Sequence, residues 1–351
     1  MTHQLLIEPL GVTVEVAPGQ TLLDAALRQG IYLPHACCHG LCGTCKVQVC
    51  DGEVEHGEAN PFALMDFERD EGKTLAYCAT LTSDATIEAD IDDEPDAEII
   101  PVRDFATRVA RIVDLTPTIK AIHLALDRTL HFQAGQYVQV QIPGLGQSRA
   151  FSIANAPAHV AESGEIELNV RIVPDGAGTG YLHRSLKVGD PLQVSGPYGR
   201  FFVRKSSQQP LLFLAGGSGL SSPRSMILDL LGGGCRLPIT LVYGQRSHAE
   251  LYYNDEFRAL AARHPNFTYV PALSDDASAE VARGFVHDAA KARLDGDFSG
   301  HKAYLCGPPA MIEACLATLM QGRLFERDIY TEKFISAADT NQQRSPLFRR
   351  V

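Results

Sequence analysis

The spacing of hydrophobic positions changes along the chain and divides it into three segments. In residues 1–95 the alternating runs LLIEPL and VTVEV flank Gly11 and predict a hairpin. TLLDAALRQG then predicts a short helix with a capping box formed by Thr21 and Asp24. KVQVCDGEVE predicts a second hairpin. Two strands, a helix and further strands in this order are typical of a β-grasp fold.

Residues 102–205 contain short alternating runs separated by turn residues: HLAL, QYVQVQI, FSIAN, IELNVRIV and PLQVSG. Regularly punctuated strands of this kind predict an antiparallel β-barrel. One helix is expected near TGYLHRSL.

Residues 208–335 alternate between strand and helix patterns, which predicts a doubly wound parallel α/β sheet. The expected strands are LLFLA, ITLVYG, FTYVPAL and KAYLC. Ser222 and Pro223 are the expected N-cap and first residue of a helix through MILDLL. Asn254 is expected to open another helix that ends before Pro265. Residues 336–351 form a polar tail.

Composition narrows the classes of function. The chain of 351 residues suits two or three domains and has no apolar run long enough to span a membrane. Its start lacks the basic stretch of a signal peptide. Residues 1–100 hold 19 acidic and 4 basic side chains, a net charge of −15. This charge argues against nucleic-acid binding and favours an electrostatically steered protein partner, although it also suits a merely well-solvated surface and linker.

Four cysteines have the spacing of an iron–sulfur site. Cys37, Cys42 and Cys45 follow C-x4-C-x2-C, and Cys78 follows after 32 intervening residues. This is the plant-type [2Fe–2S] pattern, in which a tight loop supplies three thiolates and a distant segment supplies the fourth. Gly43 and a second glycine in the loop allow backbone N–H groups to approach the cluster sulfurs.

Two other uses of these cysteines compete with the cluster. Zinc sites usually pair two short C-x2-C arms, and a redox C-x-x-C would leave Cys37 and Cys78 unused. Cys38 is interpreted as a thiol beside the cluster and Cys50 as a small apolar residue, neither of them a ligand. Nine cysteines, four of them committed to a cluster, favour a reducing cytoplasm over a disulfide framework.

RAFS at 149–152 has residue types that could hold a flavin. Arg149 would pair with a pyrophosphate, Phe151 would pack beside the ring system, and Ser152 would hydrogen-bond near the reactive nitrogen. DGAGTGYLH supplies a glycine-rich helix start, which is a natural phosphate site. An ordinary strand and a simple turn are the competing interpretations. The flavin-site candidates are Arg149, Ala150, Phe151, Ser152, Gly176, Gly178 and Thr179.

GGSGLSSP and CGPPAM each follow an expected strand of the parallel sheet. Ligands bind at this carboxyl edge in open α/β folds. GGSGLSSP lacks the third glycine of the G-x-G-x-x-G pattern, and a cysteine at a strand end often only packs, so neither motif alone settles a nucleotide site. The nicotinamide-site candidates are Gly216, Gly217, Ser218, Gly219, Cys306, Gly307 and Pro308.

Taken in order, the cysteine pattern, RAFS, GGSGLSSP and CGPPAM resemble the ferredoxin–NAD(P)H reductase superfamily with an N-terminal [2Fe–2S] domain. Within it, EANPFALMD, HPNFTYVPAL, GFVHDAAKA and LMQGRLFERDIY are similar to the reductase components of bacterial multicomponent phenol hydroxylases. Departures are Phe151, where tyrosine is common, a glycine loop one residue longer than GGTGxAP, and Cys38.

The resemblance implies a ferredoxin domain at 1–95, an FAD-binding barrel at 102–205 and an NAD-binding domain at 208–335. NADH would reduce FAD, and single electrons would pass through the cluster to a di-iron oxygenase component. YTEKF resembles the segment near the flavin ring, which adds Glu332 and Phe334 as site residues beside the catalytic candidates Ser152 and Cys306.

Other functions remain open from the sequence. The same cofactors serve ring-hydroxylating dioxygenases and enzymes of deoxysugar synthesis. A pure electron carrier, a redox sensor and a zinc-binding interaction module are alternatives of other classes. For the nucleotide, VYGQRSHAEL favours NADH over NADPH, because Glu250 would repel a 2′-phosphate if it faced the ribose, while Arg246 offers only one basic group.

Overall fold

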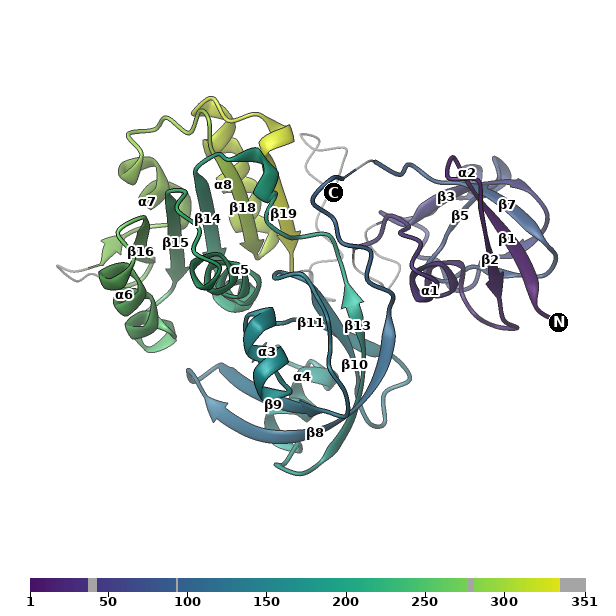
Figure 1. The fold of residues 1–351 in the computed structure, drawn as a ribbon, viewed down its shortest axis with the longest axis horizontal. Helices are drawn as coiled ribbons and strands as arrows, with labels where there is room; N and C mark the ends of the chain where they lie inside the picture. Colours follow the sequence, from purple (N-terminus) through teal and green to yellow (C-terminus); the bar gives the residue numbers. More distant parts are fainter. Residues whose placement is uncertain (37–42, 93, 277–280, 335–351) are drawn as a thin grey trace. The chain divides into compact units, whose positions relative to one another are not determined.

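The computed structural model describes residues 1–36, 43–92, 94–276 and 281–334. The chain forms two compact units, one of which covers Met1–Arg103 and the other Asp104–Ser336 (Figure 1). None of the helices in the described ranges combines the length and hydrophobicity that a membrane crossing requires.

The first unit is a five-stranded mixed sheet in the order β2-β1-β7-β3-β5, with helix α1 (Leu22–Arg28) and a small β4-β6 pair. The larger sheet is built from β1 (His3–Glu8), β2 (Val12–Val16), β3 (Lys46–Asp51), β5 (Lys73–Leu75) and β7 (Ala85–Glu88). The small pair is β4 (Val54–Glu55) and β6 (Thr80–Leu81), and a short helix α2 (Asp66–Asp70) precedes β5. This confirms the β-grasp prediction.

Neighbouring residues determine the first two strands and the first helix of this unit. β1 and β2 form the expected antiparallel hairpin, and Gly11 takes φ +63° at its turn. The Thr21 hydroxyl accepts the Asp24 N–H at 3.3 Å and so caps α1, as expected. The second predicted hairpin is wrong, because β4 pairs with β6 rather than with β3, and β3 lies between β5 and β7.

The second unit begins with a six-stranded antiparallel sheet in the order β11-β10-β13-β8-β9-β12. Its two outer strands meet at the Ile153–Leu168 bridge, so the sheet nearly closes, as the barrel prediction requires. The strands are β8 (Arg103–Asp114), β9 (Ile119–Leu126), β10 (Tyr137–Gln141), β11 (Ser148–Ser152), β12 (Glu165–Arg171) and β13 (Pro191–Tyr198). Helix α4 (Ala177–Arg184) is the expected one, whereas α3 (Pro157–Ser163) was not predicted.

A parallel sheet in the order β17-β16-β15-β14-β18-β19 completes this unit and confirms the doubly wound prediction. Its strands are β14 (Leu211–Gly216), β15 (Ile239–Gln245), β16 (Phe267–Leu273), β17 (Ala282–Arg283), β18 (Lys302–Gly307) and β19 (Ile329–Lys333). Its helices are α5 (Ser221–Gly232), α6 (Asn254–Arg263), α7 (Val286–Arg293) and α8 (Pro309–Gln321).

The strand order reverses after β17, where the chain returns to the other side of β14, and right-handed crossovers therefore place α5 and α8 on opposite faces of the sheet (Figure 1). The reversal also brings the ends of β14 and β18 side by side. Ligands of open α/β sheets bind at such a point.

One prediction within this sheet needs correction. Ser222 is not an N-cap, because α5 already begins at Ser221 and Leu220 stands at the cap position. The glycine loop itself coils into a 3₁₀ turn over Gly217–Leu220, which moves the helix start forward. The Ser222 side chain is thereby buried inside the unit, where it serves a different partner.

Barrel and parallel sheet share one hydrophobic core. Phe201 and Val203, which follow the last barrel strand, pack in the same cluster as Phe213 and Tyr304 of the parallel sheet. Because apolar burial is the main source of folding free energy, this shared core fixes the two halves of the unit together.

Candidate functional site

Three side chains that the sequence marked as catalytic candidates meet between the barrel and the parallel sheet. Cys306 on β18 lies opposite Glu332 on β19 in parallel register. Glu332 Oε2 accepts hydrogen bonds from Ser152 Oγ at 3.2 Å and from Cys306 Sγ at 3.4 Å. Ser222 Oγ donates to the same oxygen at 2.6 Å. Elements from both halves of the unit therefore converge on one carboxylate.

Sequence reasoning missed the part that Ser222 plays here. The sequence around a serine after a glycine loop is the same whether its side chain caps a helix or is buried inside the unit. Only the packing of α5 against β18 and β19 decides between the two, and no signal in a single sequence carries that information.

This cluster is polar yet enclosed. Glu332 as a residue is half-buried, but its carboxyl group is surrounded by protein, and burial raises its pKa against the opposing effect of the three hydrogen bonds. Burial, followed by the nearby Glu332 carboxylate, raises the pKa of the Cys306 thiol well above its usual value. Burial therefore favours the neutral thiol of Cys306 and the protonated form of Glu332.

The glycine loop after β14 packs directly on the end of β18. A Cβ on Gly219 would lie 2.4 Å from the Cys306 carbonyl oxygen, and one on Gly216 would lie 2.4 Å from Met311 Sδ. Gly217 has φ +59°, which favours glycine. The loop candidates Gly216, Gly217, Ser218 and Gly219 thus lie beside the β18 candidates Gly307 and Pro308. No side chain caps the first turn of α5, which leaves backbone N–H groups for a phosphate.

The flavin candidates also come together. Arg149 on β11 crosses the first turn of α4, where a Cβ on Gly178 would lie 3.2 Å from Arg149 Cγ. Gly176 is the N-cap of α4 and has no side chain to satisfy the helix N–H groups. Thr179 Oγ1 instead accepts the Val173 N–H at 3.1 Å and holds the preceding turn. A guanidinium beside an uncapped helix start fits a pyrophosphate.

Side chains alternate along β11, so neighbouring flavin candidates point to opposite sides of the strand. Phe151 packs in part against the barrel core, on the side of β11 that also carries Arg149. Ala150 is exposed, and Ser152 points to the opposite side, toward Glu332. Phe334 packs against the core of the unit, and its N–H donates to the Gly307 carbonyl at 3.0 Å. A ring contact of either phenylalanine with a flavin stays a prediction.

Two of the four predicted cluster ligands lie in the described residues. Cys45 and Cys78 flank the paired strands β3 and β5, and the Ala76 N–H donates to the Cys45 carbonyl at 2.8 Å. Gly57 lies against Cys78, with its Cβ position 2.4 Å from the Cys78 carbonyl. These positions fit two thiolates of one cluster. Cys37, Cys38 and Cys42 lie outside the described residues, and Cys50 is exposed rather than packed.

The Glu250 carboxylate bonds to the barrel. Its Oε2 accepts hydrogen bonds from Thr116 Oγ1 at 2.9 Å and from Thr118 Oγ1 at 2.6 Å, both on the turn between β8 and β9. The carboxylate thus binds the barrel, while Arg246 is exposed. Repulsion of a 2′-phosphate by Glu250 stays a prediction.

Family models match three consecutive parts of the chain. A 2Fe-2S iron-sulfur cluster binding domain matches residues 5–83, an oxidoreductase FAD-binding domain matches 107–203, and an oxidoreductase NAD-binding domain matches 213–316. Each match covers one of the three groups of candidates described above.

Known proteins resemble the chain over its full length. It is 58% identical to the phenol 2-monooxygenase reductase component DmpP of Pseudomonas sp. strain CF600 and 55% identical to the phenol hydroxylase P5 protein of Acinetobacter pittii, over all of each chain. The crystal structure of the Amycolatopsis cytochrome P450 reductase GcoB superposes with a TM-score of 0.87 at 35% identity, covering 95% of this chain and 99% of that one.

The raised pKa of Glu332 predicts a pH-dependent stability. Below the pKa of the unfolded state, the carboxyl is protonated in both the folded and the unfolded protein, and its contribution to the free energy of unfolding is fully present. As pH rises through the folded-state pKa, the buried carboxyl ionises and that contribution is lost. Glu332→Gln should therefore gain in Tm relative to wild type between pH 5 and pH 8. Thermal unfolding followed by circular dichroism measures it, with exposed Glu326→Gln as the control. A Glu332→Gln difference that stays constant with pH contradicts the prediction.

The contact between Gly219 and the β18 carbonyl predicts a sharp steric effect. Gly219→Ala should destabilise the second unit by about 1–3 kcal/mol, because its Cβ meets backbone that cannot swing away. Gly232→Ala in the same helix segment meets nothing within 4 Å and should be neutral or stabilising. Urea unfolding of both variants checks the pair, and equal stabilities would show that the loop is not packed as described.

Proposed function

The chain belongs to the family of reductase components of phenol 2-monooxygenases, and we propose which of its residues perform each part of that role. It is an oxidoreductase that carries electrons from NADH through FAD and a [2Fe–2S] cluster to an oxygenase component. The observation that supports the division of roles best is the convergence of Ser152, Cys306 and Glu332 between an FAD-binding and an NAD-binding domain.

FAD accepts a hydride from NADH and the cluster carries single electrons; the protein supplies spacing, orientation and electrostatics. Arg149 and the first turn of α4 would hold the FAD pyrophosphate. The loop from Gly216 to Gly219 and the end of β18 would hold the NADH phosphates and nicotinamide. Ser152, oriented by Glu332, would donate a hydrogen bond to the flavin ring, and Cys306 would exclude water beside it.

Cys37, Cys42, Cys45 and Cys78 would ligate the cluster, within a ferredoxin domain at 1–95. The FAD-binding domain would cover 102–205 and the NAD-binding domain 208–335. A cytoplasmic location fits this chemistry, because cysteine thiolates persist in a reducing compartment.

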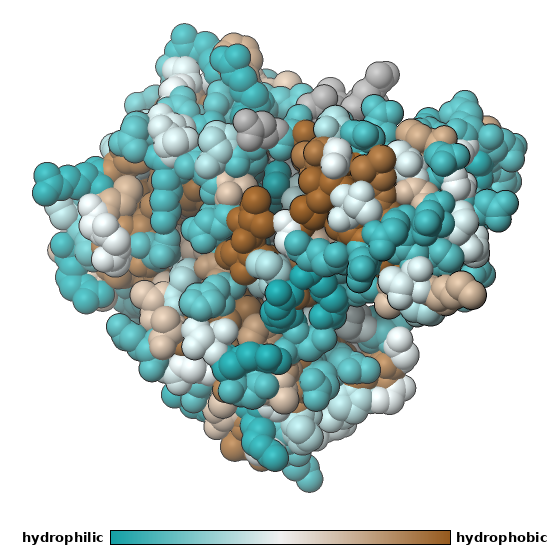
Figure 2. Space-filling model, turned by 45° about the vertical axis from the view of Figure 1, so that its right-hand side comes forward, coloured by the Kyte–Doolittle hydropathy of each residue, from teal (hydrophilic) through white to brown (hydrophobic). Residues whose placement is uncertain are grey.

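The partner would be the oxygenase component of a phenol-type monooxygenase, docked on the first unit. Three exposed apolar side chains, Phe62, Met65 and Phe67, lie within six residues of one another along the chain. Asp66 and Asp70 on α2 lie among them and are also exposed. The face drawn in Figure 2 is largely hydrophilic, with several hydrophobic areas within it. An apolar patch with an acidic rim fits a partner surface with an apolar centre and basic rim.

Because each cofactor has its own site, a substitution at the cluster should impair cluster-dependent reduction without impairing FAD reduction. Cys78→Ser should lose the cluster and lower cytochrome c reduction by about tenfold or more, while NADH still reduces FAD, because one-electron delivery needs the cluster. Cys50→Ser, an exposed thiol in the same unit, should behave as wild type. Iron content, flavin bleaching and cytochrome c reduction are measured on each. Wild-type cytochrome c rates in a cluster-less protein would mean that electrons leave from the flavin.

The acidic first unit predicts a salt-dependent encounter with the oxygenase. Exposed charges are screened beyond about 8 Å at physiological salt, so transfer from the reduced reductase should slow about tenfold from low to high salt. The double variant Asp66→Asn/Asp70→Asn should lose part of that dependence. Stopped-flow mixing measures the rate, and NADH oxidation by a small dye is the control. A rate that does not change with salt would leave the charge as a solubility feature.

A further inference from the structure

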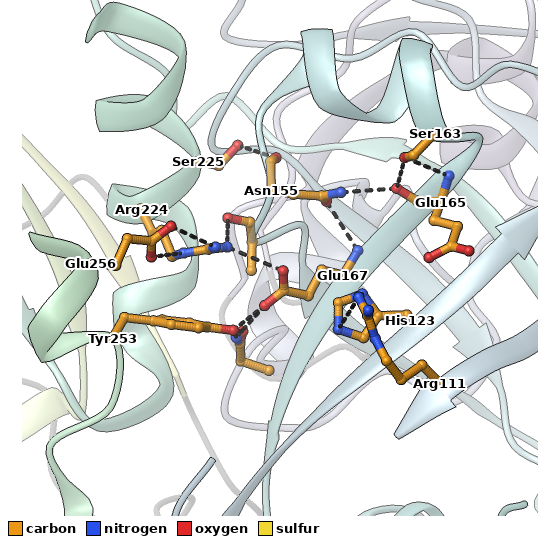
Figure 3. A network of polar contacts seen from close by, with 12 residues as sticks. Arg111, His123, Asn155, Ser163, Glu165, Glu167, Arg224, Ser225, Tyr253 and Glu256 are labelled. Carbon is orange, nitrogen blue, oxygen red and sulfur yellow. Dashed lines mark hydrogen bonds and ion pairs between the residues drawn. The ribbon is translucent and has the colours of Figure 1, made fainter. Parts of the chain in front are cut away.

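Helix α5 is fastened to the barrel by two neighbouring side chains. Arg224 Nη1 donates to the Ala154 carbonyl at 2.9 Å, and Ser225 Oγ donates to the Asn155 carbonyl at 2.8 Å (Figure 3). Arg224 is 8% exposed and Ser225 is fully buried. Both bonds end on consecutive backbone carbonyls, so they hold the direction of this barrel segment as well as its distance from the helix.

A charged network holds the guanidinium in place. Arg224 Nη1 lies 3.2 Å from Glu167 Oε2 on β12, and its Nε and Nη2 bind both oxygens of Glu256 at 2.7 and 3.1 Å. The guanidinium also stacks 4.1 Å from the centre of the Tyr253 ring, whose hydroxyl donates to Glu167 (Figure 3). Planar stacking and a bidentate bond are contacts that lysine cannot reproduce.

The network keeps its charge although it is enclosed. Burial lowers the pKa of Arg224, but Glu167 and Glu256 more than offset this, and the net shift is upward. Removing one member of such a buried pair leaves the opposite charge without compensation. The fastening is therefore rigid as well as permanent over the physiological pH range.

Arg224 lies close in sequence to Ser222 and close in space to the segment that carries Ser152. Ala154 follows Ser152 by two residues, and Arg224 follows Ser222 by two residues, and both serines donate to Glu332. The guanidinium thus joins the two backbone segments that bring these hydroxyls together. Its own bonds go to Ala154, Glu167 and Glu256, outside the group formed by Ser152, Ser222, Cys306 and Glu332.

We propose that Arg224 is a positioning residue that sets the nucleotide loop and α5 at the correct distance from the flavin site. Its bonds go to protein groups, and it acts through the segments that carry Ser152 and Ser222. This inference rests on the proposed function, since it assigns a purpose to the spacing between the two sites. A misplacement of about 1 Å between reacting groups can cost about 100-fold in rate.

A matched pair of variants separates positioning from stability. Arg224→Gln removes the fastening between the barrel and α5. Lys302→Met removes another largely buried ion pair, between Lys302 and Asp328, which lies wholly within the NAD-binding half. Both should lower the Tm of the FAD-loaded protein. Tyr253→Phe, which keeps the stacking and loses the hydroxyl contacts to Glu167 and Asn169, is a milder change if Arg224→Gln does not fold.

The first measurement is anaerobic stopped-flow reduction of the flavin by NADH. Arg224→Gln should lower the limiting rate about 10–100-fold with a nearly unchanged NADH Kd, and Tyr253→Phe should show the same pattern more weakly. Lys302→Met should keep the wild-type limiting rate. Equal limiting rates in wild type, Arg224→Gln and Tyr253→Phe would overturn the proposal and leave the network a purely stabilising one.

The second measurement needs no turnover. Hydrogen–deuterium exchange of the resting protein should speed up in the first turns of α5 and around Ala154 in Arg224→Gln, and not in Lys302→Met. Unchanged exchange at both segments would also overturn the proposal. If NADH failed to reduce the wild-type flavin, the proposed function would fall, and the exchange result would still decide whether Arg224 couples the two segments.

Discussion

Three carboxylates, each bonded to the opposite half of the second unit, determine how its two cofactor domains meet. Glu332 of the parallel sheet accepts a bond from Ser152 of the barrel, and Glu250 accepts bonds from two barrel threonines. Glu167 of the barrel binds Arg224 and Tyr253 in the other direction. Because each carboxylate is at least partly removed from water, losing its partner would be costly, and the halves are held in one arrangement.

That arrangement connects the fold to the chemistry. The reversal of strand order brings the glycine loop beside the end of β18, and the pairing of β18 with β19 places Cys306 opposite Glu332. The barrel then adds Ser152 and, next to α4, Arg149. Hydride transfer between two separately bound cofactors depends on distance and alignment. A junction with a neutral thiol and a carboxyl of raised pKa suits such a transfer, since it excludes water without adding a fixed charge.

Much of this could be predicted from the sequence because its signals are local. Alternation in VTVEV, the Thr21 cap and the strand–loop–helix order of 211–232 each depend on neighbouring residues. The failures involve distant partners. β4 pairs with a strand 25 residues later, and Ser222 bonds to a glutamate on another strand. No periodicity records such contacts, and Arg224 likewise gave no sequence signal of its buried network.

Flavin and cluster work in series within one chain. Anaerobic titration with NADH, followed by the absorbance of both cofactors, tests it most directly. A flavin that stores two electrons and a cluster that stores one should together consume about 1.5 NADH per chain, with cluster bleaching in every molecule that holds both. An end point of about one NADH, with the cluster absorbance unchanged, would contradict a path from the flavin to the cluster.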